Sequence, residues 1–129
     1  MIRTETIIAV DNVVASSKWY QLLLDCTNTH MNGAIFDQLV DADGTILLCL
    51  HHWGDHGHPS LLCPDQGLVG NGLSLFFRLN DFDKAWDRAK KLVSKIEAEP
   101  HINPLAGHNE FTVRDLDGYY ITICSNTII

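Results

Sequence analysis

The sequence repeats itself, and the repeat limits the folds that the chain can adopt. Residues 41–44 (DADG) precede the β-prone run at 45–49 (TILLC), and 74 residues later residues 115–118 (DLDG) precede 119–123 (YYITI). Asp-x-Asp-Gly between two β-prone runs is typical of a hairpin turn in which glycine supplies a positive φ. We therefore predict two similar structural units, each ending in a hairpin.

The two units also begin alike. Residues 6–10 (TIIAV) and 73–79 (LSLFFRL) are short apolar runs typical of strands. Residues 13–24 and 82–93 follow them, and in both stretches apolar side chains recur at helical spacing. An Asn or Asp directly before each stretch is expected to cap the helix.

Each half thus contains a strand, a helix and then strands joined by hairpins. This order predicts an α+β fold of two tandem βαβββ modules, which form curved mixed sheets with the helices on the outer face. We place module one at about residues 1–58, a linker rich in Gly, Pro and His at about 59–70, and module two at about 71–127. All 129 residues are expected to form one domain.

Composition excludes several classes of protein. A net charge of −7 argues against nucleic-acid binding, which normally needs a basic surface. No apolar run is long enough to span a membrane, and the N-terminus has no signal-peptide pattern, so we expect a cytoplasmic protein. The four cysteines are scattered, which argues against disulfides and structural zinc, and Cys49 and Cys124 in apolar runs are expected to be buried thiols.

Alternation along the strands separates a helix-covered face from an open face. An open face that curls over becomes a concavity of the kind that binds small molecules, although it could also be plain solvated surface. We assign Ile7, Leu48, Leu50 and Phe76 to the open face, where they favour a lined cleft. The polar and aromatic residues assigned to it are Ser74, Arg78, Glu110, Thr112, Arg114, Tyr120 and Thr122.

Histidines are dense at residues 51–58 (HHWGDHGH). Alternation with Leu48 places His52, rather than His51, in the cleft, with Trp53 at its mouth. The His-x-His and the Asp of this stretch could gather a metal, but no helix fixes their spacing.

Two further histidines, His101 and His108, fall in the stretch before Glu110, which we expect to be a loop. Three interpretations of the histidines stay open. They can form hydrogen bonds within polar loops, contact a ligand, or bind a metal.

The sequence resembles the vicinal oxygen chelate superfamily, which includes glyoxalase I, bleomycin-resistance proteins, fosfomycin-resistance enzymes and extradiol dioxygenases. The resemblance lies in residues 7–24 (IIAVDNVVASSKWYQLLL), 75–92 (LFFRLNDFDKAWDRAKKL), 99–111 (EPHINPLAGHNEF) and 111–124 (FTVRDLDGYYITIC). It covers nearly the whole chain and implies the same paired βαβββ fold.

Metal-dependent members of this superfamily place ligands at four strand positions. By resemblance these positions are Glu5, Leu48, Ser74 and Thr122. Leucine cannot coordinate a metal, and neutral Ser and Thr hydroxyls are poor ligands for Zn²⁺, iron or nickel. We therefore expect no metal at these positions and no cofactor.

The resemblance implies a small-molecule-binding protein most like the antibiotic-binding bleomycin-resistance branch, a homodimer with a cleft for an unidentified ligand. One alternative is an enzyme, either metal-free with Glu5 or Glu110 as general base or with a displaced metal. Another is a structural homodimer with a vestigial cleft. The predicted ligand-binding residues are Glu5, Leu48, His52, Trp53, Ser74, Phe76, Arg78, Glu110, Thr112, Tyr120 and Thr122.

Overall fold

The computed structural model describes residues 4–29, 33–57, 61–65, 67, 70, 73–92, 95–104 and 107–128. The chain divides into two compact units, Met1–Leu68 and Val69–Ile129. Part of the predicted linker lies outside the described residues. His58 and Val93, at the ends of the predicted first module and second helix, lie outside them as well. None of the described helices is long and apolar enough to cross a membrane.

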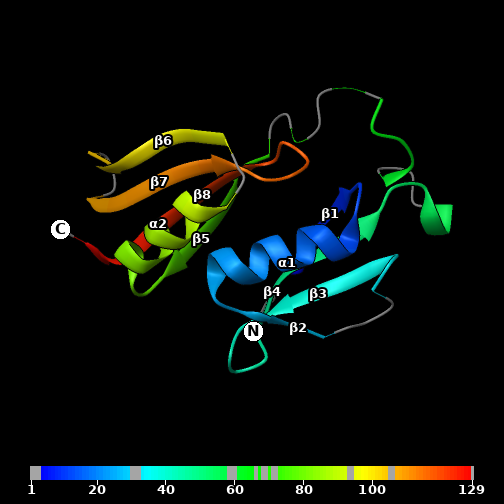
Figure 1. Ribbon diagram of the computed structural model, residues 1–129, viewed down its shortest axis with the longest axis horizontal. Helices are drawn as coiled ribbons and strands as arrows, with labels where there is room; N and C mark the ends of the chain where they lie inside the picture. The colour runs from blue at the N-terminus through cyan, green and yellow to red at the C-terminus, as the bar shows by residue number, and fades with distance from the viewer. Residues whose placement is uncertain are drawn as a thin grey trace. The chain divides into compact units, whose positions relative to one another are not determined.

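The first unit is a four-stranded mixed sheet with one long helix (Figure 1). Its strands lie in the order β1-β4-β3-β2, with β1 and β4 parallel and the other pairs antiparallel. Its elements are β1 (Ile7–Val10), α1 (Val13–Leu24), β2 (Thr27–Asn28), β3 (Phe36–Val40), β4 (Ile46–His52) and the short 3₁₀ helix η1 (Asp55–Gly57).

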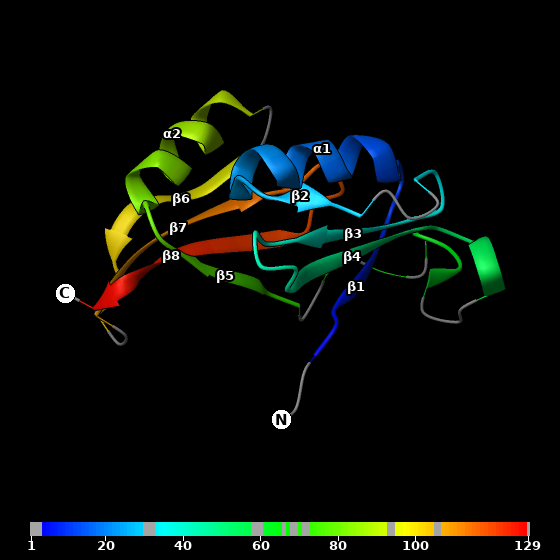
Figure 2. The same cartoon turned by 90° about the horizontal axis from the view of Figure 1, so that it is seen from below.

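The second unit repeats this topology. Its strands lie in the order β5-β8-β7-β6, with β5 and β8 parallel. In Figure 2 each helix covers one face of its own sheet. The predicted α+β class with two tandem βαβββ modules is confirmed. The elements are β5 (Leu75–Leu79), α2 (Phe82–Lys91), β6 (Lys95–Ile102), β7 (His108–Arg114) and β8 (Tyr120–Ile128).

The two helices begin differently. Asn12 caps α1, because its side-chain oxygen accepts a hydrogen bond of 2.9 Å from the Ala15 N–H. Asp81 at the start of α2 has a left-handed conformation (φ 53°), and its side chain makes no capping hydrogen bond. Asp81 therefore occupies the predicted N-cap position but does not cap the helix through its side chain.

The two Asp-x-Asp-Gly turns have the same geometry. The Asp41 N–H donates to the Thr45 carbonyl, and the Asp115 N–H donates to the Tyr119 carbonyl. Glycine has a positive φ in both turns, 85° at residue 44 and 89° at residue 118. The hairpins that revealed the repeat are thus confirmed.

The first hairpin nevertheless has one extra residue in β4 that has no counterpart in the equivalent part of β8. Val40 pairs with Ile46, but the next residue, Leu39, pairs with Leu48, so Leu47 forms a β-bulge. Pairing in the second hairpin is continuous from Arg114–Tyr120 to Thr112–Thr122. The residue equivalent to Thr122 is therefore Cys49. The prediction that placed Leu48 there is wrong.

The bulge also reverses the predicted faces of β4. Asp37 accepts a hydrogen bond from Ser17 of α1, and Leu50 lies in the same row of the sheet, so this row faces the helix. Leu48 and Leu50 are fully buried on that side. His51, and not His52, shares the open face with Cys49, because a shift of one residue moves every side chain to the other face.

The faces of the second sheet follow the prediction. The ring of Phe111 packs against Phe82 and Trp86 of α2, at centroid distances of 5.5 and 5.1 Å. Phe76 pairs with Thr122 on the opposite, open face. The two faces therefore differ as alternation predicts.

Candidate functional site

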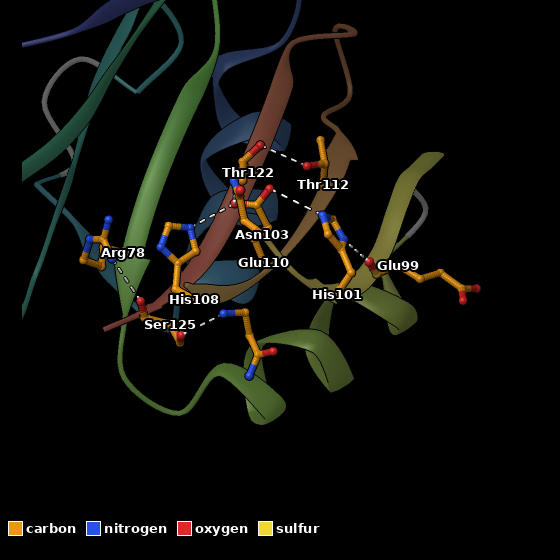
Figure 3. A network of polar contacts seen from close by, with 10 residues as sticks. Arg78, Glu99, His101, Asn103, His108, Glu110, Thr112, Thr122 and Ser125 are labelled. Carbon is orange, nitrogen blue, oxygen red and sulfur yellow. Dashed lines mark hydrogen bonds and ion pairs between the residues drawn. The ribbon is translucent and has the colours of Figure 1, made fainter. Parts of the chain in front are cut away.

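The carboxylate of Glu110 is the centre of a polar network on the open face of the second sheet (Figure 3). Oε2 accepts hydrogen bonds from His108 Nε2 at 3.0 Å and from Asn103 Nδ2 at 3.3 Å. Only 14% of the Glu110 side chain is exposed, and His108 is buried. The neighbouring side chains hold this carboxylate in one orientation. It keeps lone pairs that can accept hydrogen bonds from a ligand.

His101 borders the same carboxylate from β6. Its Nε2 lies 3.5 Å from Glu110 Oε1, and its Nδ1 lies 2.8 Å from the Glu99 carbonyl oxygen. Because a carbonyl only accepts, Nδ1 carries a hydrogen, and Nε2 can donate to Glu110 only when the ring is doubly protonated. This cluster of a carboxylate and two imidazoles can hold and pass a proton.

An aromatic platform adjoins the carboxylate. The ring of Phe76 is 48% exposed and meets the ring of His108 edge-on at 5.9 Å. The Arg78 guanidinium lies 5.8 Å from the Phe76 centroid and donates to the Ser125 carbonyl at 3.2 Å. Within the described part of the chain Arg78 forms no ion pair with Glu110, whose ion-pair partners are His101 and His108.

The two threonines of the predicted site engage each other. Thr112 Oγ1 and Thr122 Oγ1 are buried and 2.9 Å apart, so one hydroxyl donates to the other. Cys124 lies beyond them on β8, and burial raises its thiol pKa. The negative charge of Glu110 adds to this rise and the positive charge of Arg78 opposes it.

Tyr120 belongs to a different cluster. The Arg114 guanidinium lies 4.8 Å from the centroid of the Tyr120 ring, donates to the Gly118 carbonyl at 2.9 Å and pairs with Glu97 at 3.1 Å. These contacts brace the hairpin, and they do not include Glu110. Among the described residues Tyr120 contacts Arg114, so its place in the site stays a prediction.

The predicted site residues of the first unit are dispersed. Glu5 is exposed, Leu48 is buried against α1, and Trp53 is half-buried beyond the end of β4. His52 pairs with Asp55, its Nδ1 lying 2.6 Å from Oδ2. Leu48 therefore does not share an open face with Glu5, contrary to the prediction.

The residues present do not fit the metal centre that the fold family implies. With the bulge accounted for, the four positions hold Glu5, Cys49, Ser74 and Thr122. Burial raises the Cys49 thiol pKa, with a smaller rise from Glu5. The second unit contributes two neutral hydroxyls, and that of Thr122 is bonded to Thr112. The described residues contain no group of three His, Cys, Asp or Glu that could hold a metal.

Sequence reasoning missed the partners of Glu110. The segment expected to be a loop is largely strand, since His101 lies in β6 and His108 in β7. His108 and Glu110 are two residues apart, so strand alternation places them on one face. That spacing was a usable signal for His108, whereas the approach of His101 and Asn103 depends on the pairing of β6 with β7.

Each unit also contains a pocket on described residues. A pocket of about 510 Å³ lies where β5 meets α2, lined by Asn80, Asp81, Asn109, Ser125 and neighbouring residues. A pocket of about 270 Å³ lies beside α1, with the buried carboxylate of Asp37 in its wall. Asp37 Oδ2 accepts hydrogen bonds from the side chains of Ser17 and Asn28, each at 2.7 Å. These hydrogen bonds offset the cost of burying its charge.

Comparison with known proteins identifies the fold. No family model and no curated protein matches the sequence. Among solved structures, a glyoxalase/bleomycin resistance protein/dioxygenase family enzyme from Burkholderia phytofirmans PsJN has a TM-score of 0.76 at 16% identity, covering 97% of both chains. TioX from Micromonospora sp. ML1 has a TM-score of 0.72 at 15% identity, covering 98% of this chain and 100% of TioX.

An enzyme named as a lactoylglutathione lyase, from Agrobacterium tumefaciens, is also similar. Its TM-score is 0.70 at 18% identity, covering 97% of this chain and 93% of the lyase. Likeness at such identities establishes the fold and not the activity. The chain therefore has the vicinal oxygen chelate fold, shared with glyoxalase/bleomycin resistance/dioxygenase proteins.

Proposed function

We propose that the protein binds a small organic molecule on the open face of its second sheet, without the metal centre usual for the fold, and sequesters it as bleomycin-resistance proteins do. The Glu110 carboxylate, partly buried and held by His108 and Asn103, is the observation that carries the proposal. The ligand class that suits it is an aromatic compound bearing a cationic or hydrogen-bond-donor group.

The chemistry of the face supports this ligand class. An exposed phenyl ring such as Phe76 offers apolar contact and stacking, which is worth about 0.5–1.5 kcal/mol beyond the area it buries. A hydrogen bond to a charged group contributes about 1.5–3 kcal/mol. Glu110 and Phe76 share His108 as a neighbour, so one ligand can contact both.

A metal-free enzyme is the second candidate, and the two imidazoles beside Glu110 favour it. In this alternative Glu110 accepts a proton from the ligand, and His108 and His101 hold the carboxylate in place. Binding alone would leave the ligand unchanged, whereas the enzyme would release a product. Mass spectrometry of the ligand after incubation separates the two.

The test is a binding comparison of Glu110→Gln and Phe76→Ala with the wild type. Native mass spectrometry of purified protein looks for a co-purified molecule, and fluorescence titration uses ethidium, a planar aromatic cation. We expect Glu110→Gln to weaken ethidium binding roughly ten- to a hundredfold, because it removes the charge but keeps the shape.

Glu99→Gln is the matched control, since it makes the same charge change at an exposed residue of β6. It should bind ethidium like the wild type. Circular dichroism checks that all variants are folded. If Glu110→Gln binds as tightly as Glu99→Gln, the proposed site is wrong.

A further inference from the structure

One row of the second sheet carries opposite charges on either side of a buried thiol. Arg78 of β5 and Glu110 of β7 both pair with Cys124 of β8. Residues paired across a sheet point to the same face, so the three side chains share the open face. Adjacent strands lie about 4.8 Å apart, which places the backbones of the two charged residues about 10 Å apart. Cys124 between them is fully buried, and burial raises its thiol pKa, so it stays neutral.

The two charges in this row do not neutralise each other. The ion-pair partners of Glu110 are His108 and His101, at 3.0 and 3.5 Å. Arg78 instead donates a hydrogen bond of 3.2 Å to the Ser125 carbonyl, and no carboxylate of the described residues forms an ion pair with it. A guanidinium carries five N–H donors in a planar fork. Most donors of this exposed arginine therefore remain available to a ligand.

The ring of Phe76 adjoins the surroundings of both charges. The Arg78 guanidinium lies 5.8 Å from the Phe76 centroid, and the His108 ring, which is bonded to Glu110, lies 5.9 Å from it. In the view of Figure 3 the His108 ring lies between Arg78 and the Glu110 carboxylate. A ligand ring stacked on the half-exposed Phe76 therefore has a cation within reach at one end and an anion at the other.

We propose that Arg78 binds a carboxylate of the ligand, which makes the ligand an aromatic zwitterion with its cationic group on Glu110. This inference rests on the proposed function and narrows its ligand class. The guanidinium fork matches the geometry of a carboxylate and can donate two parallel hydrogen bonds to it. A ligand with a cation at both ends would meet like charge at Arg78, so the same row disfavours dications.

The experiment compares two compounds of nearly identical shape by NMR titration of the isotope-labelled full chain. The first, para-(aminomethyl)benzoate, carries an ammonium and a carboxylate across one ring. The second, para-(aminomethyl)benzamide, has a neutral amide in place of the carboxylate. The wild type should bind the benzoate about three- to tenfold more tightly, a modest gain because ion pairs of an exposed arginine are weak. The net charge of −7 favours the opposite order, so this preference would identify a local cation.

Arg78→Gln should remove or reverse the preference for the benzoate, because it removes the charge that faces the carboxylate. Lys84→Gln is the matched control, since it removes one positive charge at an exposed residue of α2, and it should keep the preference. Glu110→Gln should weaken both compounds, which share the ammonium group. Circular dichroism checks that the variants are folded.

The outcomes separate this inference from the proposed function. Equal binding of the two compounds by the wild type, or a preference that survives in Arg78→Gln, would overturn the inference and leave the proposed function standing. A loss of the preference in Lys84→Gln as large as in Arg78→Gln would also overturn it. If neither compound binds, or if Glu110→Gln binds both like the wild type, the proposed function fails and the inference fails with it.

Discussion

Side chains at equivalent positions give the open faces of the two sheets different chemistry. Thr112 and Thr122 pair in the second sheet, and Gln38 and Cys49 occupy the same places in the first. The threonine hydroxyls hydrogen-bond to each other, and the buried Cys49 thiol has a raised pKa, so neither pair offers a ready anionic ligand. The side chains at these positions, rather than a difference in the backbone, therefore explain why the residues do not fit the metal centre of this fold.

Cys26 should be the slowest of the partly exposed thiols to alkylate. Burial, together with the charges of Asp41 and Asp25, raises its pKa from 9.0 to about 11. At pH 8 its thiolate fraction is then about a hundredfold lower than that of an ordinary cysteine. Mass spectrometry of iodoacetamide-treated native protein should show Cys63 modified first, and the Cys26 rate should rise about tenfold per pH unit up to pH 11.

The same shift has a consequence for stability. A thiol whose pKa is higher in the folded state stabilises the fold below pH 9 and loses that contribution as pH rises through about 11. Cys26→Ser should therefore be less sensitive to alkali than the wild type in urea unfolding between pH 9 and 11. Rapid alkylation of Cys26 at pH 8 in the folded protein would contradict both expectations.

At the scale of elements, the sequence predicted most of the fold and about half of the candidate site. Turn chemistry and periodicity located both helices and both hairpins, and alternation in β5 identified Phe76 as open. The bulge at Leu47 could not be predicted, because a bulge depends on cross-strand register and leaves no mark in an apolar run. Leu48 was misplaced for that reason alone.

The bulge gives a test of register. Deleting Leu47 should leave the pairing of Leu39 with Leu48 intact and make the first hairpin like the second. We expect a loss of less than about 2 kcal/mol in the free energy of unfolding, since a half-buried leucine is removed. Deleting Tyr120 from β8, which has no extra residue there, should shift the strand by one residue and abolish folding.

Urea denaturation followed by circular dichroism measures both deletions. A protein that tolerates the loss of Tyr120 as well as the loss of Leu47 would show that register is not fixed by these pairings. Failure of the Leu47 deletion to fold would show that the extra residue is needed for the first hairpin.

At the scale of the whole molecule, one topology used twice leaves two open sheet faces to be covered or filled. Ile7 is 47% exposed on the first and Phe76 is 48% exposed on the second. Glu110 and its partners give the second face a polar centre, whereas His51 and Cys49 occupy the first. The repeated topology therefore gives each unit one open sheet face, and the different side chains give the two faces different binding chemistry.

We expect the protein to form a homodimer that covers part of these faces. Large apolar side chains on an open sheet face are usually buried by an interface or a ligand, and symmetric dimers are the commonest oligomers. Ile7→Glu places a charge on the first open face and should shift the molecular mass from dimer to monomer in analytical ultracentrifugation. Leu22→Glu, which makes the same change at a 60% exposed residue of α1, should leave the dimer unchanged. A wild type that stays monomeric at high protein concentration would refute this expectation, and equal effects of the two variants would place the interface elsewhere.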